Sequence, residues 1–291
     1  MLVAVVLPLV LAFIMFSLGL GLRKEDFLRV AQQPKLVALG LCNQLVFLPI
    51  IGLGLASLFG LPPLLAVGMV ILALCPGGVT SNMLTRLANG SPPLSISLTA
   101  VSSLLSILIV PFMVAWAVAF FGLAETQQVN ITALGFQMFL ITAIPVMAGM
   151  VFTRLTPALV ERISKPVAHA ATVLFFLIVA LAIKANWEAL TRHFATLGPA
   201  LLALLLIMLA LGLITGSLLG VAPREKTTIC IESGIQNATL GMAVAAFVGA
   251  GTSEEGLSDT ALPSAVYGVL MYFIVVPFVL WRRAIHGREA G

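Results

Sequence analysis

The chain has 291 residues, of which 60% are hydrophobic and only 9% are charged. In a soluble globular domain roughly a quarter of the residues are charged, so this composition excludes a soluble protein and indicates a surface that faces lipid. The formal net charge of +4 does not indicate nucleic-acid binding, because the basic residues lie almost entirely in short loops between apolar stretches.

Apolar stretches follow one another along the whole chain, and a helix needs about 20 such residues to cross a bilayer. Cutting the sequence at charges, Gly/Pro pairs and polar clusters predicts nine transmembrane helices. They cover about residues 2–22, 36–58, 62–85, 92–121, 130–153, 166–184, 196–220, 226–250 and 260–281. The predicted fold class is an all-α membrane protein with a single transmembrane domain over residues 1–291.

The basic residues predict the orientation of these spans through the positive-inside rule. An odd number of spans puts the two termini on opposite sides of the membrane. With the N-terminus outside, every Lys and Arg except Lys184 and Arg192 falls in a cytoplasmic loop or in the C-terminal tail. We therefore expect a multi-pass protein of the cell membrane with its C-terminus in the cytoplasm.

One carboxylate, Glu232, lies inside a predicted span, whereas the other acidic residues lie in loops. A charge within a membrane span costs a few kcal/mol and usually marks an ion or substrate path. Glu232 has no Lys or Arg nearby in the sequence, and polar residues crowd the same segment. This pattern favours a functional carboxylate over a protonated one that only bonds a neighbouring helix.

Helix-breaking residues interrupt two of the predicted spans. Pro76-Gly77-Gly78 interrupts the third span, and Gly234 followed by Gln236-Asn237 interrupts the eighth. Backbone unwinds at membrane depth only where it lines a cavity. The two interrupted spans are five spans apart and cross the membrane in opposite directions. This relation indicates that the first four and the last four spans are inverted repeats. In transporters built this way the ligand lies near the midplane, between the broken helices.

The fourth span carries a polar stripe. Ser95, Thr99, Ser102 and Ser106 follow one another at spacings of four, three and four residues, which places them on one helix face. Hydrogen bonding between helices is an equally good explanation for Ser102 and Ser106.

Polar side chains with oxygen atoms occur at two more places within the predicted spans. Asn43 and Gln44 lie in the second span, and Ser81-Asn82 follow the first break. Buried amides need polar partners, and hard cations take oxygen ligands of this kind. A single carboxylate among neutral oxygens favours Na+ over a divalent ion.

Three motifs resemble the bile acid:sodium symporter family, and the likeness extends over essentially the whole chain. They are Cys75-Pro76-Gly77-Gly78 with Ser81-Asn82, Leu94-Ser95-Ile96-Ser97-Leu98-Thr99, and Glu232-Ser233-Gly234-Ile235-Gln236-Asn237. The resemblance implies that a panel domain moves against a core domain by alternating access. The panel would comprise about residues 1–22 and 129–192, and the core about residues 36–122 and 194–283.

The resemblance also implies two sodium sites. The first would use Ser81, Asn82, Ser95, Thr99 and Glu232. The second would use the side chains of Gln44, Glu232 and Gln236 with the backbone oxygens of Ser233 and Ile235. Family members carry other side chains at Ser233 and Ile235, a difference that backbone ligation tolerates.

The implied cargo is an organic anion that docks beside the breaks, at Gly77, Gly78, Thr80 and Asn237. Tyr267 in the ninth span is a further candidate for this site, although simple packing is the more ordinary explanation for it. Family members are associated with bile acids, pantoate and its relatives, and pyruvate. A small carboxylate is the favoured cargo, with bile acids as adventitious ligands.

The sequence thus predicts a sodium-coupled symporter that imports an organic anion. A proton-coupled carrier of the same fold, with Glu232 as the proton site, is the main alternative. An ion channel is less favoured, although oxygens around a break also suit a selectivity filter. An intramembrane enzyme is disfavoured, because the sequence has no His-Glu-x-x-His motif and its three histidines are scattered.

Overall fold

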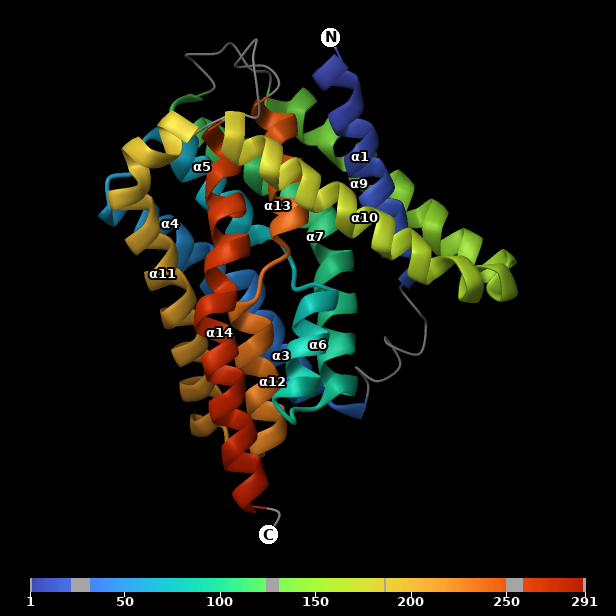
Figure 1. Cartoon of the computed structure of the whole chain (residues 1–291), viewed down its shortest axis with the longest axis vertical. Helices are drawn as coiled ribbons and strands as arrows, with labels where there is room; N and C mark the ends of the chain where they lie inside the picture. The colour runs from blue at the N-terminus through green and yellow to red at the C-terminus, as the bar shows by residue number, and fades with distance from the viewer. Residues whose placement is uncertain (1, 22–31, 124–130, 186, 250–258, 290–291) are drawn as a thin grey trace.

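The protein is described by a computed structural model of residues 2–21, 32–123, 131–185, 187–249 and 259–289. These residues form helices and turns, and no strand occurs among them, which confirms the all-α prediction. The first half comprises α1 (Leu2–Gly21), α3 (Pro34–Cys42), η1 (Asn43–Phe47), α4 (Leu48–Leu58), α5 (Pro63–Leu74), α6 (Val79–Leu87) and α7 (Pro92–Phe120). The second half comprises α9 (Ile131–Leu155), α10 (Pro157–Ala185), α11 (Trp187–Leu218), α12 (Pro223–Gly234), α13 (Ala238–Gly249), η2 (Asp259–Ala261) and α14 (Leu262–Glu289). The helix α1 starts at one end of the long axis and α14 finishes at the other (Figure 1).

Four helical segments of the described chain are long and apolar enough to cross a bilayer by themselves. They are Pro34–Leu58, Pro92–Phe120, Phe194–Leu218 and Asp259–Ile285. A fifth candidate is the pair Ala143–Leu155 and Pro157–Ser164, which is bent by 120°. The topology of nine spans remains a prediction, because the described residues give four such segments, or five with the bent pair.

Two helices begin well before their predicted spans. The sequence placed helix starts at about residues 166 and 196, whereas α10 begins at Pro157 and α11 begins at Trp187. Hydropathy predicts only the apolar part of each helix. The helix itself also includes polar residues outside that part, such as Glu161 in α10. The start of α10 follows from Pro157 itself, because proline suits the first turn of a helix.

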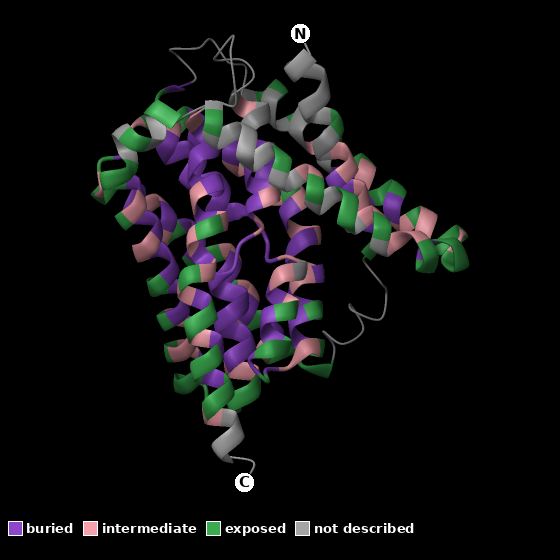
Figure 2. Ribbon diagram, viewed as in Figure 1, coloured by how far each residue is buried: buried purple, intermediate pink, exposed green. Residues whose placement is uncertain are grey.

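Burial has the pattern of a protein in lipid. Buried residues concentrate around the middle of the molecule, and the outer helix faces are exposed (Figure 2). Those outer faces carry large apolar side chains such as Phe112, Leu206 and Phe273. Soluble monomers rarely expose apolar surface on this scale, so the exposed faces fit a hydrocarbon solvent.

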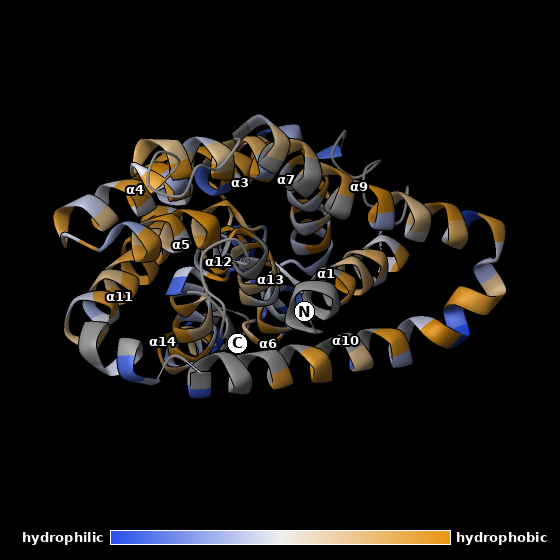
Figure 3. Cartoon of the chain, turned by 90° about the horizontal axis from the view of Figure 1, so that it is seen from above, coloured by the Kyte–Doolittle hydropathy of each residue, from blue (hydrophilic) through white to orange (hydrophobic). Residues whose placement is uncertain are grey.

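Helix α1 packs against both α9 and α10. Seen from above, the ends at which α9 and α10 meet lie on the side opposite α4 and α11, and α10 runs back from there toward α14 (Figure 3). Glycine allows α1 and α9 to cross closely, because a Cβ at Gly19 would overlap the Val146 carbonyl oxygen and one at Gly149 would overlap that of Phe16. These three helices contain most of the residues predicted for the panel, whereas residues 187–192 of that prediction lie at the start of α11.

Candidate functional site

Both predicted interruptions are found as breaks between helices. Extended backbone separates α5 from α6 at residues 75–78 and α12 from α13 at residues 235–237. Pro76 accounts for the first break, since it lacks an N–H and its ring disrupts the preceding turn. The two breaks touch, because the Asn237 N–H donates to the Pro76 carbonyl oxygen at 2.8 Å. We call this contact the crossover; the two connections meet near the middle of the molecule in Figure 1.

The carboxylate of Glu232, in the last turn of α12, faces two hydroxyl groups of α7. Its side chain is only 4% exposed. Ser95 Oγ donates to Glu232 Oε1 at 2.5 Å, and Thr99 Oγ1 donates to Oε2 at 3.0 Å. Asn82 Oδ1 of α6 lies 2.7 Å from Ser95 Oγ and 3.5 Å from Thr99 Oγ1. Ser95 and Glu232, which are 137 positions apart in sequence, therefore belong to one polar cluster.

Ser81, the fifth residue predicted for the first sodium site, lies close to the same carboxylate. It is fully buried, and its Oγ donates to the Gly78 carbonyl oxygen at 2.7 Å. A Cβ built on Gly77 would lie 2.8 Å from Glu232 Oε2 and 3.1 Å from Ser81 Oγ. Both oxygens thus border the Gly77 backbone, and all five predicted residues are gathered around one point.

The two α7 hydroxyl groups face more acceptor oxygens than they have hydrogens to donate. The hydroxyl hydrogens of Ser95 and Thr99 face three acceptors, namely the two Glu232 oxygens and Asn82 Oδ1. No basic side chain of the described residues forms an ion pair with Glu232. A buried carboxylate needs a positive partner, and a hard cation prefers oxygen ligands. These oxygen ligands therefore fit Na+ as a transported ion.

The close approach of Gly77 to this cluster gives a first prediction. We expect Gly77→Ala to raise the sodium concentration for half-maximal uptake by about 10-fold or more, because its methyl group would displace a carboxylate oxygen that Thr99 already holds. Gly54→Ala is the matched control, since a Cβ there meets no atom within 4 Å. Uptake assays over a range of sodium concentrations test both variants, and equal sodium dependence in the two would contradict the placement of Gly77.

A second polar group joins η1 to both breaks. Gln44 Nε2 donates to the Cys75 carbonyl oxygen at 2.9 Å and to Gln236 Oε1 at 2.6 Å. Gln236 Nε2 in turn donates to the Ser233 carbonyl oxygen at 2.9 Å. The structure thus brings together three members of the predicted second site. Among the described residues, no hydrogen bond connects this group to the Glu232 carboxylate or to the Ile235 carbonyl oxygen.

The residues predicted for the anion meet where two helices begin. Gly78 precedes α6 and Asn237 precedes α13, and a Cβ on Gly78 would lie 3.6 Å from Asn237 Nδ2. Asn237 Oδ1 accepts the Leu240 N–H at 3.0 Å and so caps α13. Thr80 lies in the first turn of α6. Unpaired N–H groups at helix N-termini favour an anion, so this end of the crossover is suited to a carboxylate.

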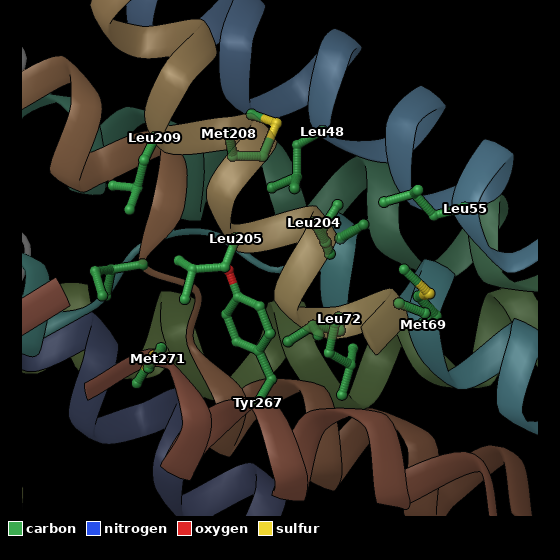
Figure 4. Packing of buried hydrophobic residues seen from close by; sticks show 14 of the residues in the cluster. Leu48, Leu55, Met69, Leu72, Leu204, Leu205, Met208, Leu209, Tyr267 and Met271 are labelled. Carbon is green, nitrogen blue, oxygen red and sulfur yellow. The ribbon is translucent and has the colours of Figure 1, made fainter. Parts of the chain in front are cut away.

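Tyr267 lies in an apolar cluster and not at the surface of the crossover. Its ring is fully buried among residues that include Leu72, Leu205 and Met271 (Figure 4). Its hydroxyl donates to the Gly234 carbonyl oxygen at 2.6 Å, which satisfies a backbone group at the break of α12. This geometry favours packing and support of the break, since contact with a cargo would require the ring to leave the cluster.

Two serines of the predicted stripe bond their own helix. Ser102 Oγ donates to the Thr99 carbonyl oxygen at 3.2 Å, and Ser106 Oγ donates to that of Ser103 at 2.8 Å. They are separate from the Glu232 cluster, and these bonds do not join helices.

Arg282 is a polar residue whose position the sequence did not reveal. The positive-inside rule predicts that it lies in the cytoplasmic tail, whereas its side chain is only 7% exposed and its Nε donates to Thr227 Oγ1 of α12 at 2.9 Å. The positive-inside rule assigns a side of the membrane to a basic residue and says nothing of its contacts.

Comparisons with known proteins agree on one family. Residues 8–193 match the family model described as the sodium bile acid symporter family. The chain is 27% identical over 284 residues to YocS of Bacillus subtilis (strain 168), an uncharacterized sodium-dependent transporter, and the alignment covers 97% of this chain and 84% of that protein. It is 28% identical over 277 residues to the probable sodium/metabolite cotransporter BASS1, chloroplastic, of Arabidopsis thaliana, covering 94% and 66% of the two chains.

A third relative is the ileal sodium/bile acid cotransporter of Oryctolagus cuniculus. It is 28% identical over 240 residues, which cover 81% of this chain and 67% of that protein. All three relatives are named as sodium-dependent transporters or cotransporters, and none is named as an enzyme. Because the family model matches well over half of the chain, the protein belongs to the sodium bile acid symporter family of sodium-dependent membrane transporters.

Proposed function

We propose that the protein is a symporter that imports a small organic anion with two sodium ions by alternating access. The observation that carries this proposal is the buried Glu232 carboxylate, held by α7 hydroxyls beside an α6 amide oxygen. The first sodium site comprises Ser81, Asn82, Ser95, Thr99 and Glu232, and the second comprises Gln44, Gln236 and Glu232 with the carbonyl oxygens of Ser233 and Ile235. The anion docks at Gly77, Gly78, Thr80 and Asn237.

The charges at the crossover supply the coupling between ion and anion. Without a cation, Glu232 repels an approaching carboxylate in surroundings of low dielectric constant. Two bound sodium ions reverse the sign of the local charge, and the N-termini of α6 and α13 then add to the attraction. The anion therefore binds the sodium-loaded protein, which prevents the carrier from moving either solute alone.

We infer the moving parts from the family resemblance. The panel comprises α1, α9 and α10, and it moves against the core that contains the crossover. We place the N-terminus outside the cell and the C-terminus in the cytoplasm. Several residues on which this orientation depends, namely Arg23, Lys24, Arg29, Glu254 and Glu255, lie outside the described residues.

Uptake into proteoliposomes tests the proposal directly. Purified protein is assayed with labelled pantoate, pyruvate and taurocholate, in sodium and in choline buffers at the same pH, with protein-free liposomes as the blank. We expect saturable uptake of at least one of these anions in sodium only. Uptake in choline that follows an imposed pH gradient would show a proton-coupled carrier, and a flux that does not saturate would show a channel.

The two sodium sites make a prediction of their own. We expect Gln44→Ala and Asn82→Ala each to raise the sodium concentration for half-maximal uptake by about 10-fold, because each removes one ligand for a charged ion. Ser57→Ala is the control for Gln44→Ala, since Ser57 is an exposed residue of the same span and bonds only the Leu53 carbonyl oxygen. The model of two sites is wrong if neither amide variant changes the sodium dependence.

A further inference from the structure

The span that carries Gln44 contains an irregular turn. Helices α3 and α4 are joined by the π-helical turn η1, in which the Leu48 N–H bonds the Asn43 carbonyl oxygen, five residues back. Pro49 accounts for this widening, because it offers no N–H to the Leu45 carbonyl oxygen and its ring clashes with that group. Single π turns are rare and frequently lie at functional sites.

The turn η1 presents two adjacent amides to different neighbours. Gln44 reaches the two breaks, as described above. Asn43 Nδ2 lies 3.2 Å from Thr215 Oγ1 of α11 and 3.4 Å from Ser233 Oγ of α12. Ser233 directly follows Glu232 in sequence, so Asn43 fastens the turn to the same part of α12 that carries the carboxylate.

Stability alone does not account for an amide at this position. Asn43 is completely buried, and its Oδ1 has no hydrogen-bond partner within the part of the chain that the structure describes. A buried polar atom without a partner is unfavourable for folding, so an apolar residue of similar size would suit a helix interface better. We infer that Asn43 instead serves to fix the orientation of η1 relative to α11 and α12.

We propose that Asn43 is a positioning residue of the second sodium site. By holding η1 against Thr215 and Ser233, it keeps Gln44 directed at the Cys75 carbonyl oxygen and at Gln236, and it does not itself contact the ion. This inference rests on the proposed sodium role of Gln44.

Thr215 offers a milder test than Asn43, whose replacement risks preventing insertion or folding. Thr215→Val keeps the shape of the side chain and removes the acceptor for Asn43 Nδ2, whereas Thr215→Ser keeps the hydroxyl and is the matched control. We expect Thr215→Val to raise the sodium concentration for half-maximal uptake roughly 2- to 10-fold, the range that corresponds to one hydrogen bond. The maximal rate at saturating sodium should be unchanged, and Thr215→Ser should behave as the original protein.

A double-mutant cycle separates positioning from general packing. If Asn43 acts through Gln44, Thr215→Val causes no further shift in sodium dependence in a Gln44→Ala background. A shift of the same size in both backgrounds, or no shift in either, overturns the positioning role while Gln44→Ala alone still tests the sodium site. If Gln44→Ala leaves the sodium dependence unchanged, the site itself is wrong and the positioning role falls with it.

Discussion

Glu232→Gln is expected to abolish sodium-dependent uptake while the protein still inserts and folds. The amide keeps the size of the side chain but removes the only carboxylate of the cluster, and Glu232 belongs to both proposed sodium sites. Removing one partner of a buried charge pair costs roughly 3–5 kcal/mol, which corresponds to more than a 100-fold loss of sodium affinity. Glu232→Ala should lose transport equally, because the charge and not the shape of the side chain holds the ions.

Ser106→Ala is the matched control for this variant. Ser106 lies on α7, the helix of Ser95 and Thr99, and its hydroxyl bonds only the Ser103 carbonyl oxygen. Its uptake should equal that of the original protein, and size-exclusion profiles in detergent should be the same for all variants. Sodium-coupled transport that persists in Glu232→Gln would remove Glu232 from the ion sites.

The features that could be predicted from the sequence are those with local signals. Pro76 and Gly77-Gly78 stand out in an apolar stretch, and Glu232 is a lone carboxylate in another, so the breaks and the central ligand follow from composition within a few residues. Asn82, Ser95 and Thr99 lie around Glu232 although they come from segments far apart in the chain. Only the family motifs predict this arrangement.

The remaining features depend on tertiary contacts without a local signal. Asn43 was noticed as a buried amide, yet its partner Thr215 lies 172 positions away in an apolar helix. Arg282 looked like an ordinary residue of a basic tail, and its burial follows from the packing of α14 against α12. The early start of α10 was missed because Glu161 and Arg162 interrupt the hydropathy without ending the helix.

The charge carried by each transport cycle gives the last prediction. If two sodium ions accompany one monovalent carboxylate, each cycle moves one net positive charge inward, and transport is electrogenic. A membrane potential of 100 mV then contributes about 2.3 kcal/mol per cycle, which corresponds to about a 45-fold increase in the accumulation ratio. The sodium gradient acts twice in addition, so a dilute acid is concentrated far more strongly than by symport of one sodium ion with one anion.

Proteoliposomes with a potassium–valinomycin potential measure this charge at a fixed sodium gradient. Initial rates and final accumulation should rise as the interior is made negative and fall as it is made positive. A rate that is indifferent to voltage would mean one sodium ion per monovalent anion, or a dianionic cargo that cancels both sodium charges. Repeating the measurement with an anion of known single charge decides between those two outcomes, because only the first stoichiometry remains indifferent to voltage with that anion.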